Sequence, residues 1–148
     1  MKMLRILGKF FIFFICIMCV DQAIKYLFTH GGLSVKGEWI DLVLIYNRGV
    51  AFSMFAFLGE YLKIIQLALI VGIFGYLIGE RAMLARFSAE LGVILGAGAS
   101  NVLDRFIHGG VVDYVFWHKW FNFAVFNFAD VMINLGVVII LLRLLIKK

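Results

Sequence analysis

The sequence contains no proline, only two cysteines and few charged residues, which make up 16% of the chain. Without proline, no helix of this chain can be kinked by that residue. Two cysteines cannot build a disulfide-rich scaffold, and the composition also excludes collagen and disordered proteins. A soluble globular domain usually carries about 25% charged residues, so the shortage of charge indicates a membrane protein.

Apolar residues take the place of the missing charge. They make up 64% of the 148 residues, and the mean hydropathy is +1.04. A spanning helix needs about 20 apolar residues, so the chain has room for about four spans. We predict one all-α integral membrane domain over residues 1–148, a four-helix bundle. Its spans are expected at about 10–28, 61–79, 87–106 and 126–146, and its outer loops at about 29–60 and 107–125.

The basic residues predict which side of the membrane the termini face. Eight of the 14 lie at the termini or in the loop between the second and third spans: Lys2, Arg5, Lys9, Arg81, Arg86, Arg143, Lys147 and Lys148. The two opposite loops hold three: Lys36, Arg48 and Lys119. Because Lys and Arg accumulate in cytoplasmic loops, both termini are expected to be cytoplasmic. Topology thus explains the net charge of +5, and no nucleic-acid partner is expected.

The first span allows a second interpretation. Its charge-free part, residues 10–20, is too short to cross the membrane, so the helix must carry Asp21 and Lys25 towards its outer end. A basic start before an apolar run is also typical of a cleavable signal peptide, but no small-x-small cleavage site follows, which favours an anchor. Cys16 and Cys19 form a C-x-x-C pair without further ligands nearby, and we expect buried apolar cysteines.

Small residues in the third span and β-formers in the first outer loop predict how the parts pack. The small residues let helices approach closely in lipid; they are Gly92, Gly96, Ala97, Gly98, Ala99 and Ser100. Residues 41–47 are β-branched and aromatic and predict a strand. Residues 47–49 then predict a turn, and residues 50–57 a second extended piece. We therefore expect a small β-sheet on the outer membrane surface.

Four aspartates map near the outer ends of the spans: Asp21, Asp104, Asp113 and Asp130. A carboxylate there costs free energy unless it is paired, hydrated or used. Three have a structural explanation. Asp21 could neutralise Lys25 at i,i+4 spacing, Asp104 could form a polar clamp between helices, and Asp130 could sit in the first turn of a helix capped by Asn127. Asp113, flanked by apolar residues in a loop, has none.

Two carboxylates brought together can share one proton, because like charges a few Å apart cannot easily both ionise. The ionised one can take a proton from water while the protonated one donates to a peptide carbonyl, as in aspartic proteases. Asp113 and Asp130 could converge in this way. The serines lack the G-x-S-x-G context of a nucleophile, and the three histidines lack ligand spacing, so no metal is expected.

Five segments in this order resemble the motifs of the lipoprotein signal peptidase (signal peptidase II) family. They are DQAIK at 21–25, NRGVAFS at 47–53, GAGASNVLDR at 96–105, VVDY at 111–114 and FNFAD at 126–130. The resemblance implies a bacterial inner-membrane aspartic protease with an outer β-cradle. Such an enzyme removes the signal peptide from diacylglyceryl-modified prolipoproteins, just before the lipid-bearing Cys. It needs no cofactor, and we expect a monomer in contact with membrane lipid.

By this resemblance, Asp113 and Asp130 are the catalytic pair. Five further motif residues are expected to bind substrate or support the pair: Asp21, Asn47, Asn101, Arg105 and Asn127. Asp104 resembles a structural partner. The glycine-rich stretch departs from the family's usual Gly-Gly-Ala-x-Gly-Asn, since residues 96–101 read Gly-Ala-Gly-Ala-Ser-Asn here, but the small size that close packing requires is kept.

Two functions of other classes remain open. Intramembrane acids also form proton relays, so a proton-coupled transporter or a small channel is one alternative. The clustering of the acids near one face disfavours it, because a relay needs a path across the membrane. A non-enzymatic membrane scaffold held together by the third span is the other. It predicts that replacing Asp113 or Asp130 by Asn is functionally silent.

Overall fold

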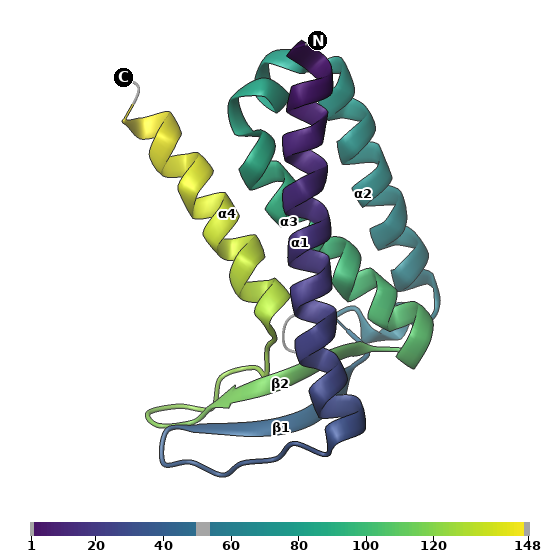
Figure 1. The fold of residues 1–148 in the computed structure, drawn as a ribbon. Helices are drawn as coiled ribbons and strands as arrows, with labels where there is room; N and C mark the ends of the chain where they lie inside the picture. The colour runs from purple at the N-terminus through teal and green to yellow at the C-terminus, as the bar shows by residue number, and fades with distance from the viewer. Residues whose placement is uncertain (1, 50–53, 147–148) are drawn as a thin grey trace.

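The computed structural model describes residues 2–49 and 54–146. Four long helices make up most of it: α1 (Lys2–Gly31), α2 (Tyr61–Gly79), α3 (Arg81–His108) and α4 (Phe128–Leu145). A two-stranded sheet lies across the end of the bundle opposite both termini (Figure 1). All four helices are long and apolar enough to cross a membrane. The predicted four-helix membrane bundle with a small β element is therefore confirmed.

Two helices extend beyond their predicted spans. Helix α1 has 30 residues rather than the predicted 10–28, because its charged ends continue the helix. Helix α3 begins at Arg81 and is kinked at Phe87, whose φ of −125° and ψ of 26° are not helical. This kink forms without proline. The Phe87 ring is contacted by the guanidinium groups of Arg86 and Arg143, 4.9 and 5.1 Å from its centre.

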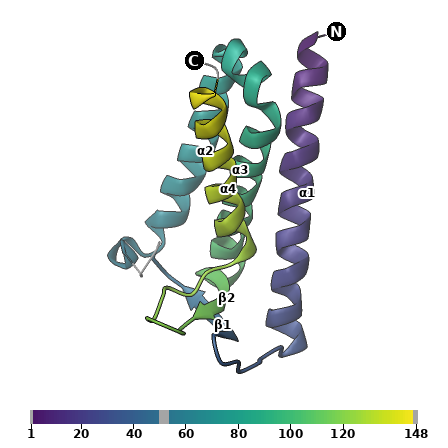
Figure 2. The same ribbon diagram turned by 90° about the vertical axis from the view of Figure 1, so that its left-hand side faces the viewer.

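Helix α3 is the centre of the bundle. Twelve of its residues are buried, against four of α1 and two each of α2 and α4. Figure 2 shows α3 between α1 and α2. Side chains at Gly92 and Gly96 would clash with the α1 backbone at Phe10 and Phe14. The small residues of α3 thus permit the close helix contact that the sequence predicts.

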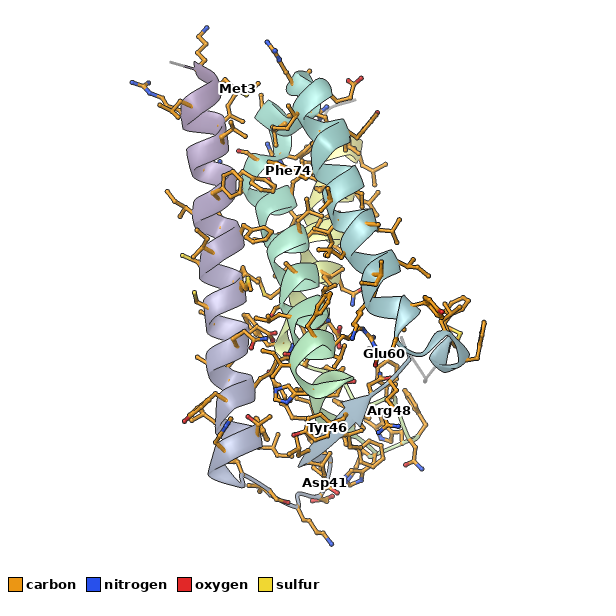
Figure 3. All side chains as sticks on the ribbon, turned by 90° about the vertical axis from the view of Figure 1, so that its right-hand side faces the viewer. Met3, Asp41, Tyr46, Arg48, Glu60 and Phe74 are labelled. Atoms are coloured by element: carbon orange, nitrogen blue, oxygen red, sulfur yellow. The ribbon has the colours of Figure 1, made fainter. Side chains whose placement is uncertain are left out.

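The half of the bundle near the termini has an apolar core. Its buried members are Phe10, Leu77, Leu84, Phe87, Leu91 and Leu95. Phe74 extends this core from α2 towards α1 (Figure 3), and its ring lies 5.2 Å from that of Phe10. Cys16 and Cys19 are exposed on α1, so the expectation that they are buried was wrong. In a spanning helix an apolar side chain can face lipid, and it then needs no place in the core.

The sheet joins the two outer loops. Strand β1 (Ile40–Asn47) pairs antiparallel with β2 (Val111–Trp117), and a β-bulge lies between Leu42 and Ile45. The predicted strand at 41–47 is confirmed, but its partner comes from the second outer loop, for which no strand was predicted. Residues 54–58 form a turn and a short 3-10 helix, η2 (Ala56–Leu58), so an extended piece there was wrong; residues 50–53 of that prediction lie outside the described residues.

The connection from α3 to β2 is very short, and two glycines make it possible. Gly109 ends α3 in the left-handed conformation, with φ of 71°. Gly110 lies so close to β1 that a Cβ atom would stand 3.1 Å from the Asn47 carbonyl oxygen. The chain therefore turns directly from α3 into β2, and it brings Asp113 next to β1, opposite Ile45.

Candidate active site

Asp113 lies in strand β2. The prediction that it lies in a loop was therefore wrong. Its side chain is 2% exposed. Two amide groups donate hydrogen bonds to its carboxylate: Asn127 Nδ2 to Oδ1 at 2.7 Å and Asn47 Nδ2 to Oδ2 at 3.0 Å. Asn47 is in reach because it ends β1 beside the strand that carries Asp113. The sheet therefore positions both the acid and one of its hydrogen-bond donors.

Asp130 lies in the first turn of α4, where it forms a capping box with Asn127. Asp130 N donates to Asn127 Oδ1 at 3.0 Å, and Asn127 N donates to Asp130 Oδ2 at 3.2 Å. The predicted N-cap is therefore confirmed. The other carboxylate oxygen, Oδ1, accepts a hydrogen bond from Asn101 Nδ2 at 3.0 Å. Capping fixes the carboxylate and still leaves Asp130 partly exposed in a cavity.

Asn127 joins the two aspartates. Its side-chain amide donates to Asp113, while its backbone N–H donates to Asp130. The same amide nitrogen lies 3.1 Å from Asn101 Oδ1 and 3.3 Å from the Val112 carbonyl oxygen. Asn127 is fully buried, so this geometry is shielded from water. Asp113 and Asp130 thus converge on one residue and line the same cavity.

The environment of Asp113 favours its protonated form. The pKa of Asp113 is raised from 3.8 to about 7, chiefly by burial and in part by the nearby Asp130 carboxylate. The hydrogen bonds from Asn47 and Asn127 oppose this, since they favour the charged form. Asp113 can therefore hold a proton near neutral pH, as a general acid must.

A buried ion network lies behind the aspartate pair, centred on Lys25. Lys25 Nζ is 2.6 Å from a carboxylate oxygen of Asp21 and 2.6 Å from one of Asp104. It also donates to Asn101 Oδ1 at 2.8 Å. Because Lys25 holds that oxygen, the NH₂ group of Asn101 is turned towards Asp130. The predicted pairing of Asp21 with Lys25 is confirmed, and it reaches the site through Asn101.

The two carboxylates bound to Lys25 also hold the backbone of other elements. Asp21 accepts a hydrogen bond from Ala129 N in α4 at 3.0 Å. Asp104 accepts one from Val112 N in β2 at 3.1 Å. Because these residues directly precede Asp130 and Asp113, the network fixes both strand and helix at the site. Asp104 is the interhelical clamp that the sequence suggested.

Ser100, one of the positions where the sequence departs from the family motif, is part of this network. Its hydroxyl donates to Asp21 Oδ2 at 2.7 Å and accepts from Gln22 Nε2 at 2.9 Å. Gln22 in turn donates to Asp104 Oδ1 at 2.7 Å. The hydroxyl is fully satisfied and buried, so the substitution adds two hydrogen bonds without filling the cavity.

Arg105 holds the segment that follows β1. Its guanidinium donates to the Asn47 carbonyl oxygen at 3.3 Å and to the Gly49 carbonyl oxygen. Gly49 N donates to Asn47 Oδ1 at 3.0 Å, which turns the Asn47 NH₂ group towards Asp113. Arg105 and Asn47 thus act together on the same carboxylate, and both also line the cavity.

The cavity at the site measures about 780 Å³ and lies between α2, α3, α4 and β2. Its polar lining is concentrated around the aspartates: Asn47, Gln66, Asn101, Arg105, Asp113, Asp130 and Asn134. Its other walls are mostly apolar and include Leu69, Ile70, Ile133 and Leu135. A carboxylate pair at the polar end of an apolar cavity can hydrolyse a bond in a substrate that is itself largely apolar.

Several residues of the site were missed as site residues by sequence analysis. Lys25 was noted only as a charge partner, and Gln22 and Ser100 only as parts of motifs. Tyr114 too was noted only as part of a motif: its hydroxyl accepts from Phe128 N at 3.0 Å, its ring stacks on Phe28, and burial raises its pKa to about 12. One signal could have found Lys25. The chain has only nine acids, and two of them, Asp21 and Asp104, map like Lys25 near the outer ends of the spans.

The histidines do not form a metal site with acids or cysteines. Among the described residues, no group of three or more His, Cys, Asp or Glu side chains is arranged to hold a metal ion. His118 Nε2 lies 3.1 Å from Asp41 Oδ1 and links the far ends of the two strands. Gly37 N also donates to that oxygen, which lowers the pKa of Asp41.

Comparison with known proteins decides the family. Residues 13–146 match the family described as signal peptidase (SPase) II. The chain belongs to the signal peptidase II family. A lipoprotein signal peptidase of Campylobacter jejuni is 53% identical over 135 residues, which cover 91% of this chain and 86% of that protein. One from Helicobacter pylori is 50% identical over 142 residues, which cover 96% and 87%.

The fold has solved counterparts. A bacterial membrane enzyme solved by the in meso method at 2.3 Å resolution superimposes with a TM-score of 0.77 at 23% identity, over 93% of this chain and 88% of that one. A second such structure gives 0.77 at 22% identity, over 95% of both chains. These structures agree with the predicted fold. Membership of the signal peptidase II family makes the chain a peptidase of the aspartic type, so the predicted family and enzyme class are confirmed.

Proposed function

We propose that this chain hydrolyses diacylglyceryl-modified prolipoproteins, releasing the signal peptide just before the lipid-bearing Cys, with Asp113 and Asp130 as the catalytic pair. The observation that carries the proposal is the convergence of both carboxylates on Asn127 at the polar end of an apolar cavity. Asp21, Asn47, Asn101, Arg105 and Asn127 support the pair or contact the substrate. The printed name of the relatives, lipoprotein signal peptidase, agrees with this substrate.

The two aspartates differ in a way that assigns their roles. Asp113 is almost fully buried and its pKa is raised to about 7, so it carries the shared proton. Asp130 lies in the first turn of α4, where the positive end of the helix dipole stabilises an ionised carboxylate. Asp130 removes a proton from water as the water oxygen attacks the scissile carbonyl, and Asp113 donates its proton to the carbonyl oxygen. Asp130 then gives the proton that it took from water to the leaving amine as the C–N bond breaks, and Asp113 takes a proton back from a hydroxyl of the tetrahedral intermediate as the carbonyl group forms again.

The cavity fits a lipid-modified peptide better than a soluble one. Its apolar walls come from α2 and α4, two helices whose outer surfaces expose large apolar side chains. The acyl chains of the substrate would lie along these walls, with the thioether-linked Cys near the aspartates. The substrate therefore enters laterally from the bilayer, and the enzyme works as a monomer in contact with membrane lipid.

The charge distribution supports an orientation in the membrane. Both termini and the turn between α2 and α3 lie at the end of the bundle opposite the sheet (Figure 1). The basic residues concentrate at that end, which is therefore cytoplasmic. The sheet and the aspartates face the outer side of a bacterial inner membrane, where the signal-peptide junction of an exported lipoprotein arrives.

The test is cleavage of a diacylglyceryl-modified prolipoprotein by the purified protein in lipid nanodiscs. Asp113→Asn and Asp130→Asn should each lower kcat by about 10²- to 10⁴-fold, because each removes a general acid or base. Asp41→Asn is the matched control, since Asp41 pairs with His118 at the far end of the sheet, and it should cleave normally. Folding is checked by the unfolding midpoint of each variant.

Two results would contradict the proposal. One is cleavage by both dyad variants at the wild-type rate, which would move catalysis to other groups. The other is absence of cleavage by the folded wild type together with proton flux into proteoliposomes that depends on Asp113. That combination would favour a transporter.

A further inference from the structure

The cavity contains a polar group that neither the aspartate pair nor its supporting network uses. Gln66 of α2 lines the cavity, and its side-chain oxygen Oε1 is buried without a hydrogen-bond partner among the described residues. Its neighbours in the same wall, Leu69 and Ile70, are apolar. A buried acceptor without a donor is costly, and nearly all such groups in proteins are paired. A ligand with a donor would remove that cost.

Gln66 lies level with the residues that hold Asp130. The side chain of Ile70 adjoins Gly98, where a Cβ atom would stand 3.6 Å from Ile70 Cδ1. Gln66 is one helical turn from Ile70 towards the sheet, and Val102 is one turn from Gly98 in the same direction. Because α2 and α3 are antiparallel neighbours, Gln66 faces the cavity at the level of Asn101 and Val102. It therefore lies at the depth of the aspartates.

The missing partner must be a hydrogen-bond donor. This requirement distinguishes the lipid part of the substrate from its peptide part. A diacylglyceryl group has ester oxygens and a thioether, which accept hydrogen bonds but cannot donate them. A peptide backbone has N–H donors. An extended peptide within a membrane must have its N–H and C=O groups satisfied by the protein, since lipid tails offer no partner. A carboxamide offers one acceptor and one donor group, which match the two halves of a peptide unit.

We propose that Gln66 binds the backbone of the substrate peptide next to the scissile bond, with its carboxamide rotated so that the buried Oε1 enters the cavity and accepts a peptide N–H. This inference rests on the proposed function and identifies the part of the substrate that α2 recognises. Gln66 is a positioning residue, because it holds the extended chain against the aspartates and does not touch the reacting atoms. It would act on any side-chain sequence, which suits an enzyme that processes many different lipoproteins.

Gln66→Met tests the proposal, because methionine keeps the length and apolar contacts of glutamine and removes its hydrogen bonds. We expect KM for a diacylglyceryl-peptide to rise about tenfold, the usual worth of one neutral hydrogen bond, with little change in kcat. The unfolding midpoint of the empty enzyme should stay the same or rise, since an unpaired buried group has been removed. Leu67→Met on the lipid-facing side of α2 is the matched control and should change neither quantity.

A backbone ester scan of the substrate identifies the bound group. In a series of diacylglyceryl-peptides, one N–H at a time near the scissile bond is replaced by an ester oxygen. In the wild type, one ester should lower kcat/KM about tenfold. In Gln66→Met, the same ester should cost nothing further, because the hydrogen bond is already gone.

Three outcomes would overturn the proposal. The first is an unchanged KM in a folded Gln66→Met variant. The second is an ester scan in which every replacement costs the same in wild type and variant. The third is a wild-type scan without a sensitive position, which needs no variant to fold. In all three the wild type still cleaves the unmodified peptide, so the proposed function would stand. Absence of cleavage in wild type, with Gln66 intact, would instead refute the proposed function and this inference with it.

Discussion

The half of the bundle near the termini and the half beneath the sheet are packed in different ways. The first is filled by apolar side chains of α1, α2 and α3, with no buried ion pair among the described residues. The second contains buried charged and amide side chains that form hydrogen bonds and ion pairs with one another, with Lys25 between two carboxylates. Both halves belong to the same helices, α1 and α3, so the difference arises from side chains and not from the backbone.

The difference shows how a membrane protein can place a catalytic group. Apolar packing in lipid does not distinguish strongly between arrangements, because lipid tails are as apolar as the side chains themselves. A polar group within the membrane must find its own partner, so it accepts few arrangements. The network around Lys25 therefore fixes geometry, and the apolar half holds the helices together.

The largest effect should come from breaking the network at its centre. Lys25→Met leaves Asp21 and Asp104 buried without a cation, and the free energy of unfolding should fall by about 3–5 kcal/mol. The peptidase activity should also fall, because Asn101 is no longer held in position for Asp130. The measurement is unfolding of the purified variant, together with cleavage below its midpoint.

Lys63→Met is the matched control for this change. Lys63 pairs with the exposed Glu60, so its loss should cost less than about 1 kcal/mol. Equal destabilisation by the two variants would mean that the buried network does not hold the outer half together.

A smaller effect, confined to stability, is expected in the apolar half. Leu84 is fully buried in the core, and Leu84→Ala should cost about 2 kcal/mol by leaving a cavity. The kcat and KM of the folded fraction should remain those of wild type, since Leu84 lies about 30 Å along α3 from Asp104. A large loss of kcat in this variant would show that the two halves are coupled. It would contradict the claim that the apolar half contributes only to stability.

The smallest effect should be the response of stability to pH. The pKa of Asp113 is raised to about 7 by folding, so the stability linked to its proton is complete below about pH 4 and is lost as the pH rises through 7. The Asp113 contribution should fall by about 1.4 kcal/mol between pH 6 and pH 8. Unfolding titrations at both pH values measure it, with Asp113→Asn as the reference. The same slope in this variant would assign the effect to other groups.

Sequence reasoning reached the helices more easily than the sheet. Long apolar runs must form helices in a membrane, because every backbone group has to be satisfied within the segment. A strand depends on a partner that can lie anywhere in the chain. Residues 41–47 had the composition of a strand, but the partner was sought at 50–57 and was found at β2, more than 60 residues away.

The residues of the candidate site also fall into those that the sequence predicted and those that it did not. Asp113 and Asp130 stand out in the sequence because a carboxylate near hydrocarbon needs an explanation, and the family motifs point to the same residues. Lys25 and Gln66 did not stand out. Lysine paired at i,i+4 looks like local neutralisation, and one glutamine in an apolar helix has no motif around it. Their meaning depends on atoms brought together from other helices.

The sequence by itself determined the membrane class, the four spans and the family, and it singled out the two aspartates as candidates for the catalytic pair. These follow from composition, from the length of apolar runs and from residues in a fixed order, which are properties of the chain alone. The tertiary structure decided that Asn127 joins the aspartates, that Lys25 orients Asn101, and that Gln66 lines the cavity while its side-chain oxygen is buried without a partner among the described residues. Hydrogen bonds depend on distances of a few tenths of an ångström between residues far apart in the chain, and only the folded packing of the helices sets such distances.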